Sequence, residues 1–155
     1  LPTPSPTLFY VKEFVENLCA LTSATVPEGA RPVEIGISVE PEDLILYADR
    51  SMISQVAINL LKNAIEATLD VAQPRIDLTA TVDSREQVII TIANNGPSIP
   101  PEVADQIFIP FFTTKNGGSG VGLSLSRQIM RLHGGTLQYR PGPNGTGSIF
   151  TLTFR

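Results

Sequence analysis

Three pairs of short segments in which apolar and polar residues alternate, each pair joined by a polar turn, constrain the fold of this chain most. The paired segments cover residues 33–39 with 44–48, 75–82 with 87–93, and 136–139 with 148–154. Such alternation is typical of half-buried β-strands, and short polar turns between them favour hairpins. Because stretches with helical spacing separate the pairs, the sequence predicts an α+β fold, an α/β sandwich with a mixed, mainly antiparallel sheet and helices packed on one face.

The helical stretches lie beside these strand pairs. Apolar residues from Leu8 onward recur at helical spacing, although the first of them could instead pair as an edge strand. A short helix is expected near residues 102–107. A longer helix, with apolar positions at Val121, Leu125, Ile129 and Leu132, is expected to stop at the two glycines that follow His133.

The size of the chain limits it to one domain. It has 155 residues, of which 42% are hydrophobic, and three prolines among residues 1–7 favour a linker end before a single domain over residues 8–155. The lone Cys19 and the lone His133 argue against a disulfide framework and a structural zinc site. No apolar run approaches the length of a membrane span, and no signal peptide is evident, so a cytoplasmic location is expected for this chain. Anchoring of the parent protein in a membrane is left open.

The charge of the chain is unevenly distributed. Residues 1–100 contain six basic and 13 acidic residues, whereas residues 101–155 contain five basic and two acidic ones. The net charge of −4 argues against a nucleic-acid partner. The positive C-terminal third either arises by chance or favours an anionic small ligand there.

A polar stripe lies on an otherwise apolar helix, which Asp49 or Ser51 is predicted to cap and which is expected to run to about residue 70. The stripe recurs at intervals of four residues and consists of Gln55, Asn59 and Asn63. Asparagine is unfavourable inside a helix, so these amides either bond to neighbouring backbone in the core or direct their oxygens toward Mg²⁺ and phosphates. Glu66, one turn further, is either a solvated residue or a group that orders water around the ion.

The loop expected at residues 94–101 follows a strand and begins with Asn94-Asn95-Gly96. An asparagine side chain at such a place can pair with the edge of a nucleotide base, because the amide both donates and accepts hydrogen bonds. A simple turn is the alternative interpretation.

A glycine-rich segment, residues 116–123, opens the last helix, where backbone N–H groups can bind phosphate. Its spacing is neither that of a P-loop nor that of a dinucleotide fingerprint. Lys115 and Arg127 either meet phosphate charge or are ordinary surface cations. Between the two loops, three aromatic residues either anchor a mobile flap or pack in the core: Phe108, Phe111 and Phe112.

Taken in order, these segments resemble the ATP-binding catalytic domain of sensor histidine kinases, over about residues 50–155. Residues 59–67 are similar to the N box, 94–100 to the first G box, 107–115 to the F box, 118–123 to the second G box and 145–150 to the last glycine element. Glu66 and the Phe-Phe-Thr-Thr-Lys sequence make the chain look most like the nitrogen-regulation subgroup. The resemblance implies the Bergerat fold, with ATP held between the N-box helix and a lid over about residues 101–119.

The resemblance also implies roles for individual residues. Asn63 would be the Mg²⁺ ligand, Asn59 would lie near the phosphates, Gly96 would form a wall of the adenine pocket and Ser148 would place a hydroxyl near the base. Glu66 and Arg127 are the candidates for a catalytic role. The positions assigned to nucleotide binding are Asn59, Asn63, Asn94, Gly96, Ile99, Lys115, Gly118, Gly120, Gly122, Leu123, Arg127 and Ser148.

Two residues depart from the pattern of the first G box. Asn94 stands where these kinases have an aspartate that receives the adenine amino group, and Ser98 stands where they have a glycine. Asn94 keeps an acceptor oxygen, so adenine recognition can survive with a weaker bond. His133, near the expected end of a helix, is interpreted as a capping or packing residue.

The resemblance implies transfer of the γ-phosphoryl group of Mg²⁺-ATP to a histidine on a separate dimerisation domain, then to an aspartate of a response regulator receiver domain. The isolated chain is expected to be a monomer and the parent kinase a homodimer. The alternative, suggested by Asn94, is a nucleotide-sensing module without phosphotransfer.

Overall fold

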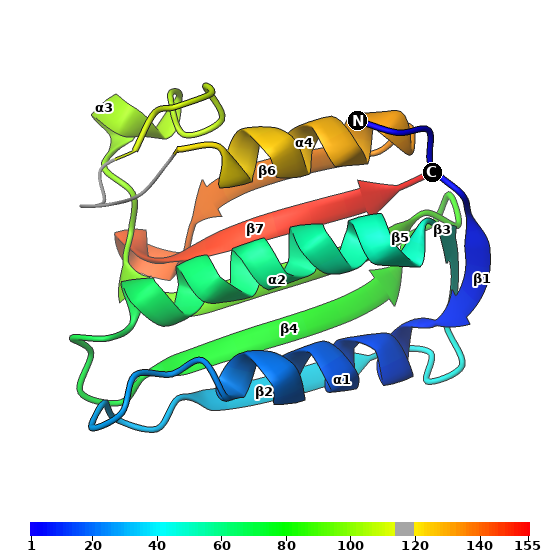
Figure 1. Ribbon diagram of the computed structural model, residues 1–155. Coiled ribbons are helices and arrows are strands. Elements are labelled where there is room, and N and C mark those ends of the chain that lie inside the picture. Colours follow the sequence, from blue (N-terminus) through cyan, green and yellow to red (C-terminus); the bar gives the residue numbers. More distant parts are fainter. Residues whose placement is uncertain (114–119) are drawn as a thin grey trace.

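The main sheet has five strands in the order β2-β4-β5-β7-β6 (Figure 1), in a computed structural model that describes residues 1–113 and 120–155. The strands are β2 Glu34–Val39, β4 Arg75–Val82, β5 Val88–Pro97, β6 Thr136–Pro141 and β7 Thr146–Phe154. Only the β2–β4 pair is parallel among these neighbours, and the other three pairs are antiparallel. The prediction of a mixed, mainly antiparallel sheet is confirmed.

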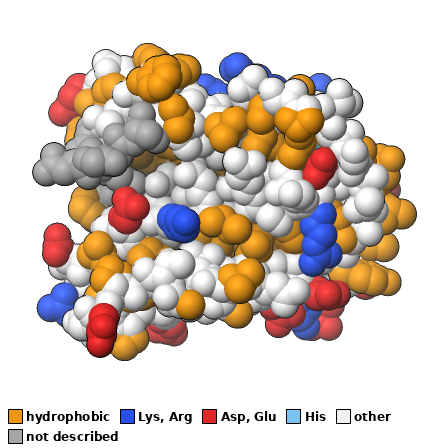
Figure 2. Space-filling view, in the orientation of Figure 1, with side chains coloured by type: hydrophobic (Ala, Val, Ile, Leu, Met, Phe, Trp, Pro, Cys, Tyr) orange, Lys and Arg blue, Asp and Glu red, His pale blue; other side chains and the backbone are white. Residues whose placement is uncertain are grey.

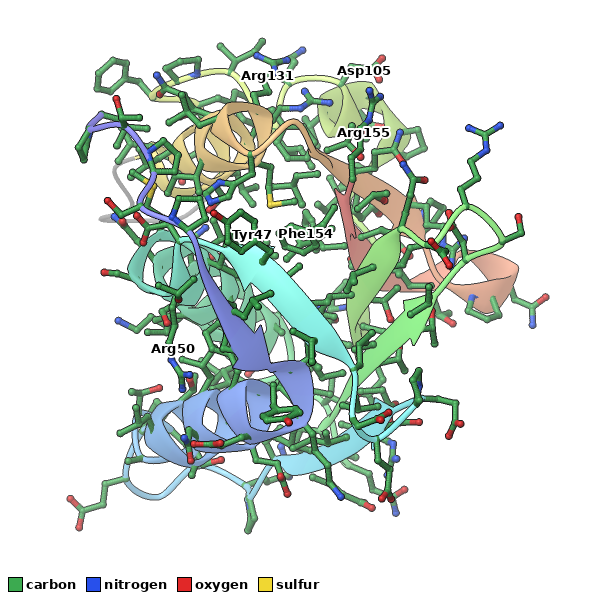
Figure 3. All side chains as sticks on the ribbon, turned by 90° about the vertical axis from the view of Figure 1, so that its right-hand side faces the viewer. Tyr47, Arg50, Asp105, Arg131, Phe154 and Arg155 are labelled. Atoms are coloured by element: carbon green, nitrogen blue, oxygen red, sulfur yellow. The ribbon has the colours of Figure 1, made fainter. Side chains whose placement is uncertain are left out.

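Helices of the described part of the chain cover one face of this sheet, as Figures 1 and 3 show from two directions. They are α1 Val11–Ser23, α2 Arg50–Ala67 and α4 Gly122–Leu132. The core lies between the two layers, because every second residue of the central strands points toward the helices and is buried. Its largest fully buried side chains include Ile53, Leu60, Leu61, Ile76, Leu78, Ile92 and Leu152.

The first predicted hairpin is wrong. Strand β2 pairs in parallel with β4, whereas β3 (Ile45–Ala48) pairs with β1 (Thr7–Tyr10) in a separate two-stranded sheet. The alternation in residues 44–48 correctly places Leu46 and Ala48 inside and Tyr47 outside. Alternation specifies which side chains face the core, but it does not specify which strand supplies the partner.

The expected loop after residue 93 also differs, because β5 continues to Pro97. Asn94 pairs with Ser148 and Pro97 pairs with Thr146, with a shift of register between them. Because of this shift, β5 contains Gly96 and Pro97 and still stays paired with β7.

The helices are shorter than the sequence suggests. The first begins at Val11 because residues 7–10 form the edge strand β1, which was the alternative interpretation of this segment. Helix α2 ends at Ala67, and the short helix α3 covers only Pro101–Ala104. A 3₁₀ turn, η1 Pro143–Gly145, lies between β6 and β7.

Asp49 caps α2, as predicted, and it also joins three parts of the chain. Its Oδ1 accepts from the backbone N–H of Met52 at 3.1 Å, and its Oδ2 accepts from that of Ser5 at 2.8 Å. These bonds, the one from Ser5 first, hold the pKa of Asp49 below its usual range.

His133 lies at the C-terminal end of α4 with both ring nitrogens engaged. Its Nε2 accepts from the backbone N–H of Asp49 at 3.0 Å, so the proton is on Nδ1, which lies 2.9 Å from the carbonyl oxygen of Ile129. The histidine therefore connects the end of α4 to the start of α2, in the packing role that the sequence suggested.

Candidate functional site

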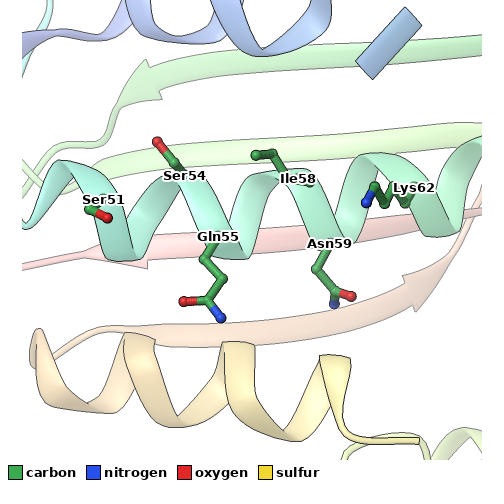
Figure 4. A pocket seen from close by; sticks show the side chains of 6 residues that line it. All are labelled: Ser51, Ser54, Gln55, Ile58, Asn59 and Lys62. Atoms are coloured by element: carbon green, nitrogen blue, oxygen red, sulfur yellow. The ribbon is translucent and has the colours of Figure 1, made fainter. Parts of the chain in front are cut away.

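The polar stripe of α2 faces α4. Figure 4 shows the side chains of Gln55 and Asn59 pointing in the same direction, toward that helix. Asn59 is half-buried, and its Nδ2 lies 3.4 Å from the Oγ of Ser126 on α4. A side chain on Gly122 would run into the Asn59 carboxamide, so the absence of a Cβ allows the start of α4 to approach α2. The amide of Asn59 thus bonds across to the neighbouring helix rather than to backbone in the core.

A shallow hollow of about 420 Å³ runs along the outer side of α2 (Figure 4). It shares Asn59 with the predicted site, and its lining consists of Ser51, Ser54, Gln55, Ile58, Asn59 and Lys62. Figure 2 shows that basic and acidic side chains stand apart from one another over the middle of this face and lie together at its lower right.

Asn63 and Glu66 lie further along α2. Asn63 is half-buried one turn after Asn59, and Glu66 is exposed near the C-terminal end of the helix. The residues of the stripe therefore extend along α2 from the hollow to the C-terminal end of the helix, which lies beside Gly96.

Asn94 and Ser148 lie directly opposite each other on β5 and β7, and Ile76 on β4 lies on the other side of Asn94. Ile76 and Ser148 are buried and Asn94 is half-buried. The side chains of this row therefore lie on the face of the sheet that the helices cover. The structure thus brings together two residues that the sequence separates by more than 50 positions.

Gly96 lies between Asn94 and the last turn of α2. Its backbone N–H donates to Oδ1 of Asn94 at 2.9 Å, and a Cβ on this residue would collide with the carbonyl group of Ala67. The close contact that requires glycine here is therefore with the end of α2. Whether Gly96 also borders a base stays a prediction.

The segment after β5 is attached to the β6–β7 connection. Ser98 Oγ lies 2.6 Å from the carbonyl oxygens of both Gly145 and Gly147, and the backbone N–H of Ile99 donates to the hydroxyl of Tyr139 at 3.0 Å. Ile99 also packs against the core. Ser98, a departure from the family pattern, thus offers these carbonyl oxygens a hydroxyl donor that glycine lacks.

The predicted lid is described only in part. Phe108 and Phe112 pack against the core, whereas Phe111 is 78% exposed and donates its backbone N–H to the carbonyl of Gly120 at 2.9 Å. Gly120 has φ +73°, which favours glycine. Lys115 and Gly118 lie outside the described residues, as does the rest of segment 114–119.

Arg127 and Leu123 lie on α4, beside the Phe108 segment. The guanidinium of Arg127 stacks over the ring of Phe108, 4.2 Å from its centroid, and Leu123 packs partly buried against the core. Sequence reasoning did not single out Ser126 or Tyr139, and the ring–cation contact of Phe108 was also missed. Each acts through a partner distant in the sequence, and local periodicity contains no signal for such pairs.

Residues 48–155 match the family model described as histidine kinase-, DNA gyrase B- and HSP90-like ATPase. The chain is 35% identical to the C4-dicarboxylate transport sensor protein DctB of Rhizobium meliloti (strain 1021) over 136 residues, 88% of this chain and 21% of that protein. It is also 35% identical to the sensor protein FixL of Bradyrhizobium diazoefficiens over 143 residues, 92% of this chain and 28% of that protein. The sensory histidine kinase/phosphatase NtrB of Rhizobium meliloti matches at 35% over 122 residues, 70% of this chain and 32% of that protein. The chain thus spans about a fifth to a third of these relatives.

Solved structures show the same fold. The catalytic domain of histidine kinase ThkA superposes with a TM-score of 0.84 at 35% identity, covering 97% of this chain and 95% of that one. ThkA in complex with the response regulator protein TrrA superposes with a TM-score of 0.79 at 32% identity, covering 97% of this chain and 42% of that one.

Among residues 1–113 and 120–155, no helix has the length and apolar character needed to cross a membrane.

The family match covers α2, β5, α4 and β7, the elements that carry the polar stripe and the Asn94–Ser148 row. This chain therefore belongs to the histidine kinase-, DNA gyrase B- and HSP90-like ATPases, as a histidine kinase catalytic, ATP-binding domain.

Proposed function

We propose that this domain binds ATP together with Mg²⁺ and transfers the γ-phosphoryl group to a histidine on a separate dimerisation domain. The observation that carries the proposal is the contact between Asn59 of α2 and Gly122 at the start of α4, on the same side of the sheet as Asn94 and Ser148. Asn59 and Gly122 are suited to contact phosphates, and Asn94 and Ser148 are suited to contact a base. A nucleotide that extended between them would lie along the end of α2.

The start of α4 supports the phosphate end of this proposal. Val121 provides no side-chain cap, and the first backbone N–H groups of an α-helix have no partner within the helix. Such groups, with the positive end of the helix dipole, attract phosphate. Gly120 and Gly122 keep side chains away from this end of the helix.

The amides of α2 support a magnesium site. Mg²⁺ prefers oxygen ligands and commonly combines few protein groups with phosphates and water, and a half-buried Asn63 beside the nucleotide fits this preference. When bound, the ion would neutralise phosphate charge. Glu66 would order water nearby, and Arg127, which stacks over Phe108, would meet phosphate oxygens.

The base end would use Asn94 and Ser148 for polar contacts and Ile99 for apolar contact. In the phosphate segment, Leu123 would pack below the glycines, while Lys115 and Gly118 would contribute from the part of the lid outside the described residues. Phosphoryl transfer depends mainly on positioning and charge neutralisation, so the domain itself needs no nucleophile. The phosphoryl group would pass from the histidine to a response regulator receiver domain, the class of protein with which ThkA was crystallised.

The proposal is tested by mixing the purified chain, Mg²⁺-ATP labelled at the γ-position and the separately expressed histidine-bearing domain of the parent kinase. Acid-labile label on that domain is the expected result. A matched reaction without the chain controls for self-labelling.

The second candidate function is nucleotide sensing without transfer, and Asn94 in place of aspartate is the observation that favours it. Calorimetric binding of ATP with no label on the histidine-bearing domain would select this candidate. Absence of binding at millimolar ATP would reject both.

A further inference from the structure

The carboxamide of Asn94 is held in one orientation by its own strand. Its Oδ1 accepts from the backbone N–H of Gly96 at 2.9 Å. Because a backbone N–H only donates, the flipped amide would place two donors against each other. The remaining polar atom of the head group is therefore Nδ2, which donates and does not accept.

The backbone that fixes this orientation has little freedom to move. Gly96 is buried, and its Cα lies so close to the carbonyl of Ala67 that a methyl group does not fit. On the other side, Gly147 packs against the carbonyl oxygen of Asn94. The strand is thus clamped between the end of α2 and β7, and the amide cannot exchange its acceptor for its donor without breaking the bond to Gly96.

An aspartate at this position would behave differently at the base. One of its oxygens would accept from Gly96, and the other would remain as an acceptor for the 6-amino group of adenine. Asn94 offers Nδ2 in that place. The Nδ2 donor opposes the 6-amino group of adenine, but it matches the 6-oxo group of hypoxanthine or guanine. Adenine can still bind, because the second lone pair of Oδ1 accepts from its 6-amino group.

We propose that Asn94 determines base specificity, so that the site accepts nucleoside triphosphates with a 6-oxopurine base as well as ATP. This inference rests on the proposed function, which places the base beside Asn94. The chemical change from aspartate removes the acceptor that favours a 6-amino group and also removes the charge that would repel a 6-oxo group.

The test compares ATP with ITP, which differ at the 6-position and at the adjoining ring nitrogen. Calorimetric titration with Mg²⁺ is carried out on the parent chain, on Asn94→Asp and on Asn144→Asp, which adds the same charge in the exposed β6–β7 turn. The affinities of the parent chain for the two nucleotides should differ by no more than about tenfold. Each base makes one hydrogen bond to Asn94, ATP with Oδ1 and ITP with Nδ2. In Asn94→Asp, the preference for ATP over ITP should rise by about tenfold or more, and Asn144→Asp should leave it unchanged.

The outcomes separate the inference from the proposed function. If the parent chain binds ATP and Asn94→Asp has the same ATP-to-ITP ratio, the inference is overturned and the proposed function stands. If the parent chain binds neither nucleotide, the proposed function fails.

A second measurement needs no variant, in case Asn94→Asp does not fold. The triphosphate of unsubstituted purine riboside lacks a 6-oxo group, so the parent chain should bind ITP more tightly. Weaker binding of ITP than of this analogue would overturn the inference.

Discussion

Gly96 and Gly122 both lie where a side chain does not fit, but their surroundings respond differently to an added methyl group. At Gly96 the methyl would meet the main chain of Ala67, which belongs to a packed helix. At Gly122 it would meet the end of the Asn59 side chain, which can rotate away. The first contact is therefore a requirement of the fold, and the second is a requirement of the site.

Gly96→Ala should therefore lower the free energy of unfolding by about 1–3 kcal/mol, the usual cost of overpacking against atoms that cannot move. Gly122→Ala should lower it by less than about 1 kcal/mol and weaken ATP binding, because it displaces Asn59. Urea denaturation measures the first quantity and calorimetry the second. Equal destabilisation by both variants would show that the Asn59 side chain is as rigid as backbone.

Asn63→Ala should remove the dependence of nucleotide affinity on Mg²⁺ while leaving the chain folded. The half-buried amide lies at the edge of the core, and Mg²⁺ would lose its protein oxygen ligand. Titration with ATP is compared with and without Mg²⁺, using Gln55→Ala, on the exposed end of the same stripe, as the control. Unchanged Mg²⁺-dependence in the Asn63 variant would remove this residue from the metal site.

At the scale of elements, α2 is the helix on which the site depends, and Asp49 secures its first turn. The carboxylate accepts from two backbone N–H groups, one from α2 and one from the N-terminal segment. The pKa of Asp49 is lower in the folded chain than its ordinary value of 3.8. The contribution of Asp49 to stability is therefore complete above that ordinary value and is lost as the pH falls through the lower folded-state pKa.

Asp49→Asn should lower the melting temperature at neutral pH, because the amide accepts through one oxygen only. The difference in melting temperature between variant and parent should shrink as the pH falls through the folded-state pKa of Asp49, because the parent side chain then becomes neutral as well. Thermal melts between about pH 7 and pH 2.5 measure it. Asp70→Asn, an exposed position just after α2, is the control, and a difference that did not vary with pH would contradict the proposed role of the charge.

At the scale of the whole molecule, the domain contains no histidine with a free ring nitrogen for its own phosphorylation. His133 is the single histidine of the sequence, and both of its ring nitrogens are engaged at the junction of α2 and α4. The chemistry proposed for this domain therefore requires a second protein surface that supplies the acceptor.

The purified chain should consequently acquire no phosphate on His133 when it is incubated with Mg²⁺-ATP, and it should be a monomer. Mass spectrometry at neutral pH detects phosphohistidine, and light scattering during size-exclusion chromatography gives the mass in solution. Adding the histidine-bearing domain provides the positive control. Phosphate on His133 would show that the junction opens under assay conditions.

The sequence contains enough information for the layers of this fold, whereas the roles of its candidate site residues stay predictions. The cap of α2 follows from local rules of helix formation, and the structure selects Asp49 from the two predicted residues. The position of Asn59 on the helix also follows from these rules, but its bond to Ser126 does not. The pairing of β3 with β1 could not be predicted, because alternation leaves the partner open. The bond from Ile99 to Tyr139 joins residues 40 positions apart and likewise depends on tertiary pairing.

The bonds around Asp49 also connect the N-terminal segment with two helices of the proposed site. Ser5 donates to Asp49, and Asp49 is bonded in turn to the first turn of α2 and to His133 at the end of α4. These are the two helices that meet where Asn59 approaches Gly122. The N-terminal segment is therefore linked by hydrogen bonds to both helices of the proposed phosphate site, by a route that does not pass through the five-stranded sheet.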